Sequence, residues 1–248
     1  MNIDRIEIQR IANTTGVNRR HLYTTIHKAL RARMSTLLVR VGQMDVHDEK
    51  ECREVVKDLE QLLNVMQDHL KTEDSVLHPY IEARNPGALA DIAADHAAQK
   101  AVIDQLRQHV QAVLPLSGDD RVAFSLFLYR ELALFIADNL THMHAEETAN
   151  HQLLWSTYSE AELHEIHAAI LASIPPEKMT FTLQWMLPAM SPAERFQMFL
   201  EIRTTAPAPA FEAVLEIARS SLSGRDWGKL TSSLGVAQVP GLVSFTSN

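Results

Sequence analysis

The chain has 248 residues, of which 46% are hydrophobic, and it carries a formal net charge of -8. This acidic balance argues against general binding to nucleic acid or to anionic membranes. A single cysteine, Cys52, excludes an internal disulfide framework and zinc motifs built from cysteine pairs.

The composition predicts an almost entirely helical fold, because glycine is sparse and good helix formers are common. The most apolar stretch, residues 122–140, contains Arg130, Glu131 and Asp138, so we do not expect it to cross a bilayer. The N-terminus lacks the apolar segment of a signal peptide. We therefore expect a cytoplasmic protein with no membrane partner.

Residues 1–33 depart from the acidic balance, since their arginines and lysines outnumber their acidic residues. Within them, Ile11, Gly16 and Leu22 have the spacing of the turn in a DNA-reading helix-turn-helix. Too few residues precede this turn for a three-helix domain, and its second helix would run on into an apolar stripe. We therefore expect residues 1–20 to be a capping segment over the end of a bundle, with no nucleic-acid partner.

Two long amphipathic helices are predicted next, each with a polar residue on its apolar face. In the first, over about residues 18–44, His27 lies in the middle of the apolar stripe. The second begins near Asp48 and ends before a Pro-Gly turn, and its apolar face carries His69 and Glu73. The stripe of the first helix consists of Tyr23, Leu30, Met34, Leu38 and Val41.

Two further helices repeat this arrangement. The third is predicted over about residues 88–114, with His96 on its apolar line, and a polar turn at residues 117–120 follows it. The fourth carries His142 and Glu146 on its apolar face. Residues four apart lie on one side of a helix, so each His-x-x-x-Glu pair aims an imidazole and a carboxylate at one point.

The spacing of these polar residues predicts that they meet at one level of an up-down bundle. In such a bundle, two residues have the same height when they are equidistant from the loop that joins their helices. The midpoints between successive histidines fall at residue 48, between residues 82 and 83, and at residue 119, each at or beside a predicted turn. The residues that meet are His27, His69, Glu73, His96, His142 and Glu146.

Such a cluster predicts a metal site. A single histidine on an apolar stripe is more often a hydrogen-bonded core residue. Carboxylates, however, are expensive to bury without a cation, and a metal ion accounts for the imidazoles as well. Nitrogen and carboxylate donors without a thiolate suit a di-iron centre better than tetrahedral structural zinc, with manganese, zinc or mixed occupancy as alternatives.

The order His27, His69-x-x-x-Glu73, His96, His142-x-x-x-Glu146 resembles the hemerythrin-like, or HHE cation-binding, domain over about residues 20–157. The resemblance implies an all-α fold, namely an antiparallel up-down four-helix bundle with a non-haem di-iron centre. It implies that the first two histidines serve one iron, the last two serve the other, and the two glutamates bridge them. An oxo or hydroxo bridge would complete the centre.

The chain departs from the oxygen-carrying hemerythrins at Lys100. Those proteins have a second histidine four residues after the one on the third helix, so here one iron loses a protein ligand. Lys100 either stays close to the bridging oxygens or reaches outward to solvent. Glu147 is an alternative to Glu146, because the carriers use a five-residue spacing from histidine to the bridging carboxylate.

Other histidines and tyrosines are expected to have structural roles. His144 and His151 lie off the ligand line, where we expect them to be solvated or hydrogen-bonded to neighbours. His78 is expected to be a surface or space-filling residue. Tyr23 and Tyr80 lie along the ligand-bearing stripes, where core packing is favoured over a role as hydrogen-bond donors to the site.

The last third of the chain is predicted to be an additional C-terminal helical region, residues 158–236, that follows a bundle of residues 21–157. Ser159 and Glu162 form a capping box for a helix that ends at Pro175-Pro176, and Ser191 and Glu194 begin another. Further helices are expected over residues 211–221 and around Trp227. Residues 237–248 are expected to be a flexible tail.

These features favour a protein that binds or senses O2, nitric oxide or redox state over a dedicated enzyme. The alternative is a di-iron enzyme that consumes peroxide or nitric oxide at open iron positions. A third hypothesis is a metal-stabilised scaffold that binds a protein partner through residues 159–236.

Overall fold

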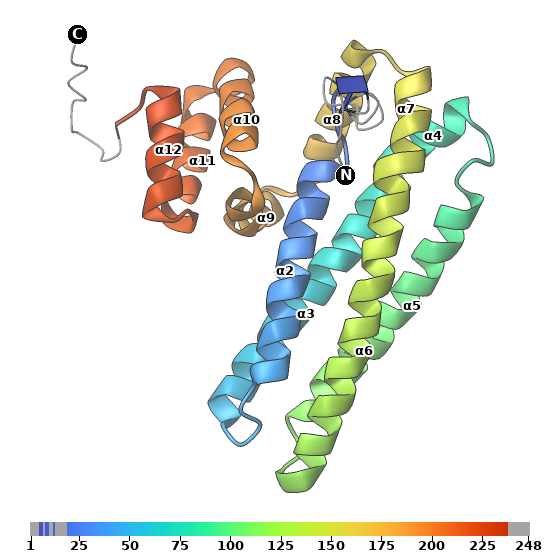
Figure 1. The fold of residues 1–248 in the computed structure, drawn as a ribbon, viewed down its shortest axis with the longest axis vertical. Helices are drawn as coiled ribbons and strands as arrows, with labels where there is room; N and C mark the ends of the chain where they lie inside the picture. Colours follow the sequence, from blue (N-terminus) through green and yellow to red (C-terminus); the bar gives the residue numbers. More distant parts are fainter. Residues whose placement is uncertain (1–4, 7, 10–11, 13–18, 238–248) are drawn as a thin grey trace. The chain divides into compact units, whose positions relative to one another are not determined.

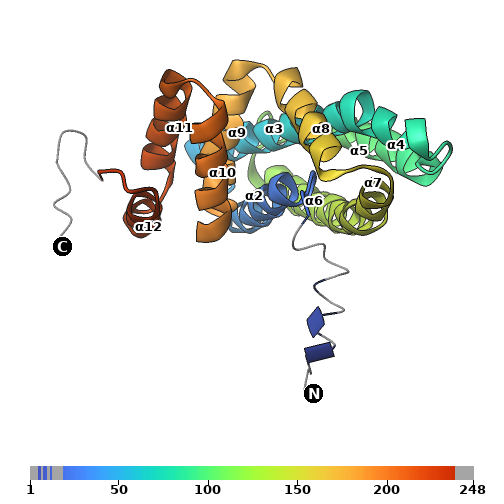
Figure 2. The ribbon, with the colours of Figure 1, turned by 90° about the horizontal axis from the view of Figure 1, so that it is seen from above.

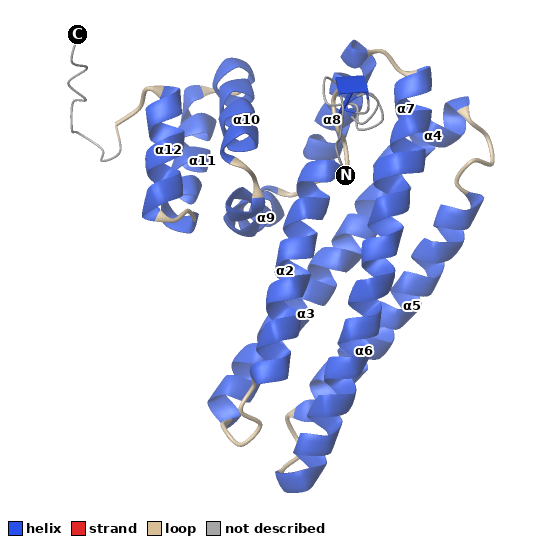
Figure 3. Cartoon of the chain, viewed as in Figure 1, coloured by secondary structure: helices blue, strands red, loops and turns tan. Residues whose placement is uncertain are grey.

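The computed structural model describes residues 5–6, 8–9, 12 and 19–237. The described residues are almost all helical and include no strand (Figure 3), so the predicted all-α class is confirmed. They fall into two compact units, one of Met1–His27 with Arg31–Ser173 and one of Lys28–Leu30 with Ile174–Asn248. Most of the predicted capping segment and helix-turn-helix motif, and nearly all of the predicted tail, lie outside the described residues.

Four long helices form the bundle of the first unit, which Figure 1 shows from the side and Figure 2 from above. Short connections join them, so each helix is antiparallel to the next. The second and fourth each continue, through a π-helical turn, into a short helix. The elements are α2 (Thr24–Gln43), α3 (Glu49–Thr72), η1 (Glu73–Leu77), α4 (His78–Arg84), α5 (Ala90–Val113), α6 (Gly118–Ala145), η2 (Glu146–Asn150) and α7 (His151–Thr157).

Arg121 ties together the two loops at one end of the bundle. Its buried guanidinium donates to the carbonyl oxygen of Leu116 at 2.6 Å and to that of Val46 at 3.1 Å. Leu116 lies in the α5–α6 connection, whereas Val46 lies in the α2–α3 connection. Both connections are therefore at the same end of the bundle, as an up-down topology requires.

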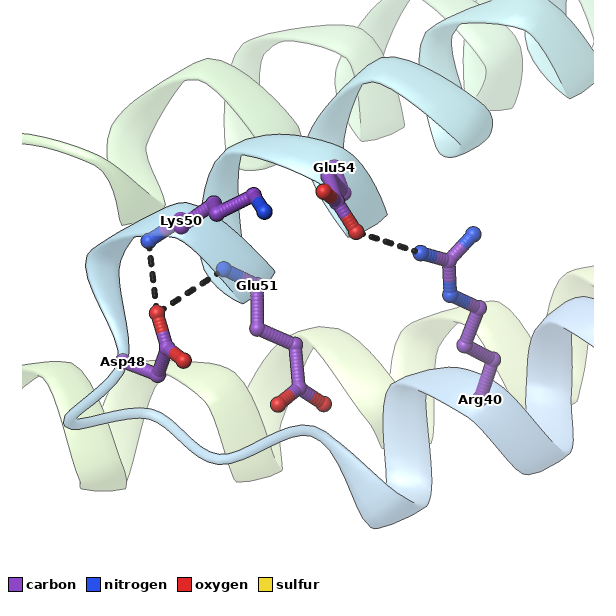
Figure 4. Close-up of a pocket in the computed structure, with 5 residues that line it drawn as sticks. All are labelled: Arg40, Asp48, Lys50, Glu51 and Glu54. Carbon is purple, nitrogen blue, oxygen red and sulfur yellow. Dashed lines mark hydrogen bonds and ion pairs between the residues drawn. The ribbon is translucent and has the colours of Figure 1, made fainter.

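Asp48 begins α3 by capping its free backbone N–H groups. Its carboxylate accepts hydrogen bonds from the N–H groups of Lys50 and Glu51 at 2.8 and 3.1 Å (Figure 4). Glu51 thus contributes its backbone to the predicted cap. The same turn lines a surface pocket together with Arg40 and Glu54. Glu54 precedes His69 by 15 residues, or about 22 Å along a helix, so this pocket lies far from the predicted ligands.

At the opposite end, a helix beyond the bundle proper closes the core. The hydroxyl of Tyr158 donates to the carbonyl oxygen of Tyr80 at 2.6 Å. The chain then enters α8 (Glu160–Ser173), whose Leu163 and Ile166 pack in one buried cluster with Tyr23 and residues of α4 and α7. The compact unit therefore extends to Ser173, past the boundary predicted for the bundle at residue 157.

The apolar faces of the four helices meet in a tightly packed core. Of the predicted α2 stripe, Leu30 and Met34 are fully buried, while Leu37 is more buried than the predicted Leu38. The opposite wall comes from α3, in which leucine and methionine recur at helical spacing. Its fully buried members are Leu59, Leu62, Leu63, Met66 and Leu70.

The second unit is a small helical assembly with its own core. It consists of α9 (Pro176–Ala189), α10 (Pro192–Thr205), α11 (Ala208–Ser221) and α12 (Gly224–Leu234). Ser191 and Glu194 form the predicted capping box at the start of α10. Helix α9 was not predicted, because Pro175-Pro176 was read only as a helix end, although Pro176 also occupies the first turn of the next helix.

Arg195 is the most buried charge of the second unit. Its side chain is 2% exposed, and its guanidinium donates to the carbonyl oxygens of Leu187 and Met190 at 3.1 and 2.8 Å. A third bond of 2.8 Å reaches the carboxylate of Asp226 on α12. Arg195 thus fastens the α9–α10 corner to α12.

None of the described helices is long and apolar enough to cross a membrane.

Candidate metal centre

The structure brings the six predicted ligand residues together inside the bundle. One histidine comes from each of the four long helices, and each glutamate is the first residue of a π-helical turn. Five of the six are buried, and the side chain of His69 is 9% exposed. They are His27 on α2, His69 on α3, Glu73 on η1, His96 on α5, His142 on α6 and Glu146 on η2.

The four imidazoles form two pairs that point their Nε2 atoms at each other. The Nε2 atoms of His27 and His69 are 3.2 Å apart, and those of His96 and His142 are 3.0 Å apart. Two nitrogens bound at right angles to one ion, each at about 2.1 Å, would be about 3.0 Å apart. Each pair therefore has the spacing of two neighbouring ligands on a single ion.

Glu73 faces both histidine pairs. Its Oε1 lies 3.3 Å from Nε2 of His69 and 3.6 Å from Nε2 of His27, whereas its Oε2 lies 3.7 Å from Nε2 of His96. Each oxygen thus belongs to a different pair, which is the arrangement that a carboxylate bridging two ions requires.

Glu146 faces the same two pairs from the other side. Its Oε2 lies 3.5 Å from Nε2 of both His27 and His142, and its Oε1 lies 3.7 Å from Nε2 of His96. All four oxygens of Glu73 and Glu146 are buried and have no hydrogen-bond partner. Buried carboxylates without partners cost several kcal/mol each, roughly, unless a cation compensates them.

The buried negative charges of the cluster also favour a positively charged partner. Burial lowers the pKa of an imidazole, but the neighbouring carboxylates of Glu147 and Glu73 outweigh burial and raise the pKa of His27 to about 9. Burial raises the pKa of a carboxyl group, yet the imidazoles of His142, His78 and His96 hold the pKa of Glu146 well below its usual value. The donor set therefore fits metal ions, and groups of these residues converge closely enough to hold them.

Comparison with protein families agrees with this geometry. Residues 19–154 match the model of the hemerythrin HHE cation-binding domain. The chain belongs to this family. No curated protein and no solved structure matches the chain.

The first histidine of each half of the HHE domain is supported by the acidic residue that follows the central glutamate of the other half. Nδ1 of His27 is 3.2 Å from a carboxylate oxygen of Glu147, and Nδ1 of His96 is 2.7 Å from one of Asp74. A hydrogen bond from Nδ1–H leaves Nε2 free as the donor atom toward an ion and fixes the ring. Glu147, the alternative to Glu146, therefore lies on the outer side of His27, while Glu146 faces the centre.

A cation in turn holds each of these acidic residues. Arg31, four residues after His27, donates to both oxygens of Glu147 at 2.7 and 3.0 Å. Lys100, four residues after His96, binds Asp74 through its ammonium group, and its side chain is 44% exposed. Lys100 thus reaches outward to Asp74. The two halves of the domain repeat the same chain of contacts.

Of the two expectations for His78, a surface residue or a space-filling one, the surface alternative is wrong. His78 is 7% exposed and its Nε2 lies 3.9 Å from Oε1 of Glu146. The sequence signal for the position of His78 was the pattern His-x-x-x-Glu-x-x-x-x-His, which occurs at residues 69–78 and again at residues 142–151. His151 ends the second copy of this pattern. It is fully buried and hydrogen-bonded, and hydrogen bonding to neighbours was one of the two alternatives expected for it.

The tyrosines and the remaining histidine of the sequence analysis occupy different environments. Tyr23 is 1% exposed, packs on His27, and receives a 3.5 Å hydrogen bond from the amide of Asn150. Burial, followed by the charges of the two central glutamates, raises the pKa of its phenol well above the usual value. Tyr80 is 36% exposed, and His144 is exposed.

Proposed function

We propose that this protein carries a non-haem di-iron centre that binds or senses O2, nitric oxide or redox state in the cytoplasm. The observation that carries the proposal is the pairing of two imidazole pairs with two carboxylates, each of which faces both pairs.

In this proposal, His27 and His69 hold one ion, His96 and His142 hold the other, and the two central glutamates bridge them. Imidazole and carboxylate donors suit iron, and manganese or zinc would accept the same set. When bound, a di-iron centre supplies redox-active ions that can bind a diatomic ligand or react with peroxide.

The chain itself keeps the site dry and fixes the rings. The central carboxylates and most of the imidazoles are buried, so bulk water has little access to the ions. Hydrogen bonds from Nδ1–H to the carboxylates of Glu147 and Asp74 orient the first histidine of each half. The phenol of Tyr23, kept neutral by its surroundings, packs against His27 and retains the proton that it can donate in a hydrogen bond.

Metal analysis of protein produced in iron-supplemented medium tests the proposal. We expect about two iron ions per chain, and Glu73→Gln should lose at least one of them because each carboxylate is needed to neutralise the pair. Glu54→Gln is the matched control, since Glu54 is on the same helix and 53% exposed. A parent protein that carries no transition metal after gentle purification would refute the proposal.

Titration of the reduced protein with O2 or nitric oxide then separates binding from turnover. A spectral change that saturates at a fixed stoichiometry supports binding or sensing. Sustained consumption of peroxide or nitric oxide identifies an enzyme instead. An iron-loaded protein that responds to none of them would act as a metal-stabilised scaffold, for which residues 159–236 are the candidate partner surface.

A further inference from the structure

His78 is a buried histidine beside the centre that the six-residue pattern leaves out. It is the first residue of α4, directly after η1, and 7% of its surface is exposed. Its Nε2 has no hydrogen-bond partner and lies 3.9 Å from Oε1 of Glu146. Its ring centroid is 5.0 Å from that of His96. An imidazole nitrogen without a hydrogen-bond partner therefore faces the same carboxylate as the proposed ligands do.

The π-helical turn η1 is what brings His78 to this face. In an α-helix, a residue five positions after Glu73 would point about 140° away from it. In a π-helical turn the backbone bond runs from residue i+5 to residue i. The N–H of His78 donates to the carbonyl oxygen of Glu73, so the two residues are stacked one turn apart. The extra residue of the turn thus puts a second imidazole next to the glutamate.

Asp74 lies beside Nδ1 of His78 as well as being hydrogen-bonded to His96. Its Oδ1 lies 3.4 Å from Nδ1 of His78 and 2.7 Å from Nδ1 of His96. With Nδ1 facing the carboxylate, the Nε2 lone pair of each ring is left for an ion. The two Nε2 atoms lie 3.9 and 3.7 Å from the same oxygen of Glu146. Both Nε2 atoms thus face one oxygen of Glu146, but the donor atoms that lie within 4.8 Å of one another are those of His96, His142 and Glu146 without His78, so the ring of His78 has to turn toward the ion to bind it.

His151 occupies the equivalent position after η2. It is also buried, but its Nε2 has a hydrogen-bond partner, unlike that of His78. Its N–H donates to the carbonyl oxygen of Glu146, as that of His78 does to Glu73. Its Nε2, however, accepts the backbone N–H of Leu22 at 3.0 Å. The two halves of the domain therefore differ at this point, and only the half with His78 offers a further donor.

We propose that His78 is a third imidazole ligand of the ion held by His96 and His142. This inference rests on the proposed metal centre. In this arrangement η1 supplies the imidazole that the chain lacks at position 100. Lys100 stands at that position, and its ammonium binds Asp74 instead. The two ions then differ, with three imidazoles on one and two on the other.

Counting coordinated imidazoles in the cobalt(II)-loaded parent tests the proposal without any variant. Each coordinated ring that keeps its Nδ1–H gives one strongly shifted, exchangeable proton resonance next to a paramagnetic ion. We expect one such resonance more than the four histidines of the pattern account for. We also expect His78→Gln to remove one of them, while His144→Gln, which alters an exposed histidine on α6, removes none.

The rate of iron release to a mild chelator is the second readout. One of the two ions should leave His78→Gln roughly tenfold faster or more, because loss of a ligand costs at least as much as loss of a residue that orients one. Added imidazole should slow release from His78→Ala toward the parent rate, since it can occupy the space of the missing ring. Circular dichroism checks that each variant keeps its helices.

The outcomes separate this inference from the proposed function. If the parent holds two ions, but shows no additional resonance and releases iron at the same rate as His78→Gln, His78 is only a buried residue that lies beside Asp74. That result overturns the inference and leaves the di-iron centre standing. If the parent holds no metal, the proposed function itself fails. If His78→Gln does not fold, the resonance count of the parent still decides.

Discussion

Oδ1 of Asp74 lies 2.7 Å from Nδ1 of His96, on the side of the imidazole that faces away from the central carboxylates. Glu147 has the same relationship to Nδ1 of His27 at 3.2 Å. Both acidic residues directly follow a central glutamate, and both are bound by a cation, Lys100 or Arg31, on the helix of the histidine they support. The support of the centre is therefore built twice from the same sequence arrangement.

The first prediction concerns these two acidic residues. Asp74→Asn and Glu147→Gln keep the shape of each side chain but remove its charge, so the supported imidazole becomes a weaker donor. We expect metal affinity to fall about 10–100-fold in each variant, as for other residues that orient metal-binding histidines. Competition with a chromogenic chelator measures the change.

The matched control is Asp104→Asn, because Asp104 is an acidic residue on α5 whose side chain is 62% exposed. Its metal affinity should equal that of the parent. If Asp74→Asn retains both ions with unchanged affinity, the contact to His96 has no role in holding the centre.

Helical periodicity was enough to predict the bundle and the convergence of six residues, because α2, α3, α5 and α6 are regular between their turns. The two π-helical turns were not predictable from that periodicity. Each inserts one residue directly after a glutamate and moves the residue five positions on to the inner face. The place of His78 beside the centre was missed for this reason, whereas His151 is hydrogen-bonded, as one of its two expected alternatives had it. The spacing His-x-x-x-Glu-x-x-x-x-His occurs in both halves.

The sequence alone also did not decide whether the side chain of Lys100 points outward or toward the centre. Its position one turn after His96 allowed either direction, and the choice depends on Asp74, which η1 displays on the neighbouring helix. A contact between residues 26 positions apart cannot be read from the periodicity of one helix. Arg31 makes the equivalent contact with Glu147, which is more than a hundred positions away.

The second prediction is that removing metal lowers the thermal stability of the first unit. An ion at 100 times its dissociation constant adds about 2.7 kcal/mol to the free energy of unfolding. For a protein of this length, that corresponds to a fall of about 5–10 °C in Tm on removal. Calorimetry before and after chelation measures it, and re-addition of iron should restore the parent value.

Glu146→Gln provides the control for this experiment. Without the charge of Glu146 the centre should bind metal poorly, so chelation should leave the Tm of the variant almost unchanged. A parent protein with the same Tm in both states would show that its folding is not coupled to metal.

The third prediction concerns Arg195 in the second unit. Arg195→Met removes the guanidinium that donates to the carbonyl oxygens of Leu187 and Met190 and to the carboxylate of Asp226. We expect a loss of about 2–4 kcal/mol, less than for a fully buried pair because Asp226 is 34% exposed. Urea denaturation measures it. Metal content should stay at the parent level, since none of the proposed ligands lies in the second unit.

Arg219→Met is the comparison for Arg195, because Arg219 is on the second unit, is 44% exposed and pairs only with exposed Glu216. Its effect should stay within about 0.5 kcal/mol. Equal losses in the two variants would mean that burial of Arg195 adds nothing to the stability of this unit.

The last prediction is a pH dependence that comes from His151. Burial, the nearby ring of His21 and the bond from the N–H of Leu22 to Nε2 favour the neutral imidazole, and the pKa of His151 is lowered to about 4. A histidine whose pKa falls on folding stabilises the protein fully above its unfolded value of about 6.5, and this contribution disappears as the pH falls toward 4. The loss over that interval is about 3 kcal/mol.

The measurement is urea denaturation of the parent and of His151→Gln at several values between pH 7 and pH 4.5. A glutamine carbonyl can accept the N–H of Leu22 but does not titrate, so the free energy of unfolding of the variant should fall less with acidification. The histidines of the metal centre titrate in both proteins, and their effect cancels in the difference. If the parent and the variant lose stability in parallel, His151 is already protonated in the folded state, and its Nε2 cannot be the acceptor for Leu22.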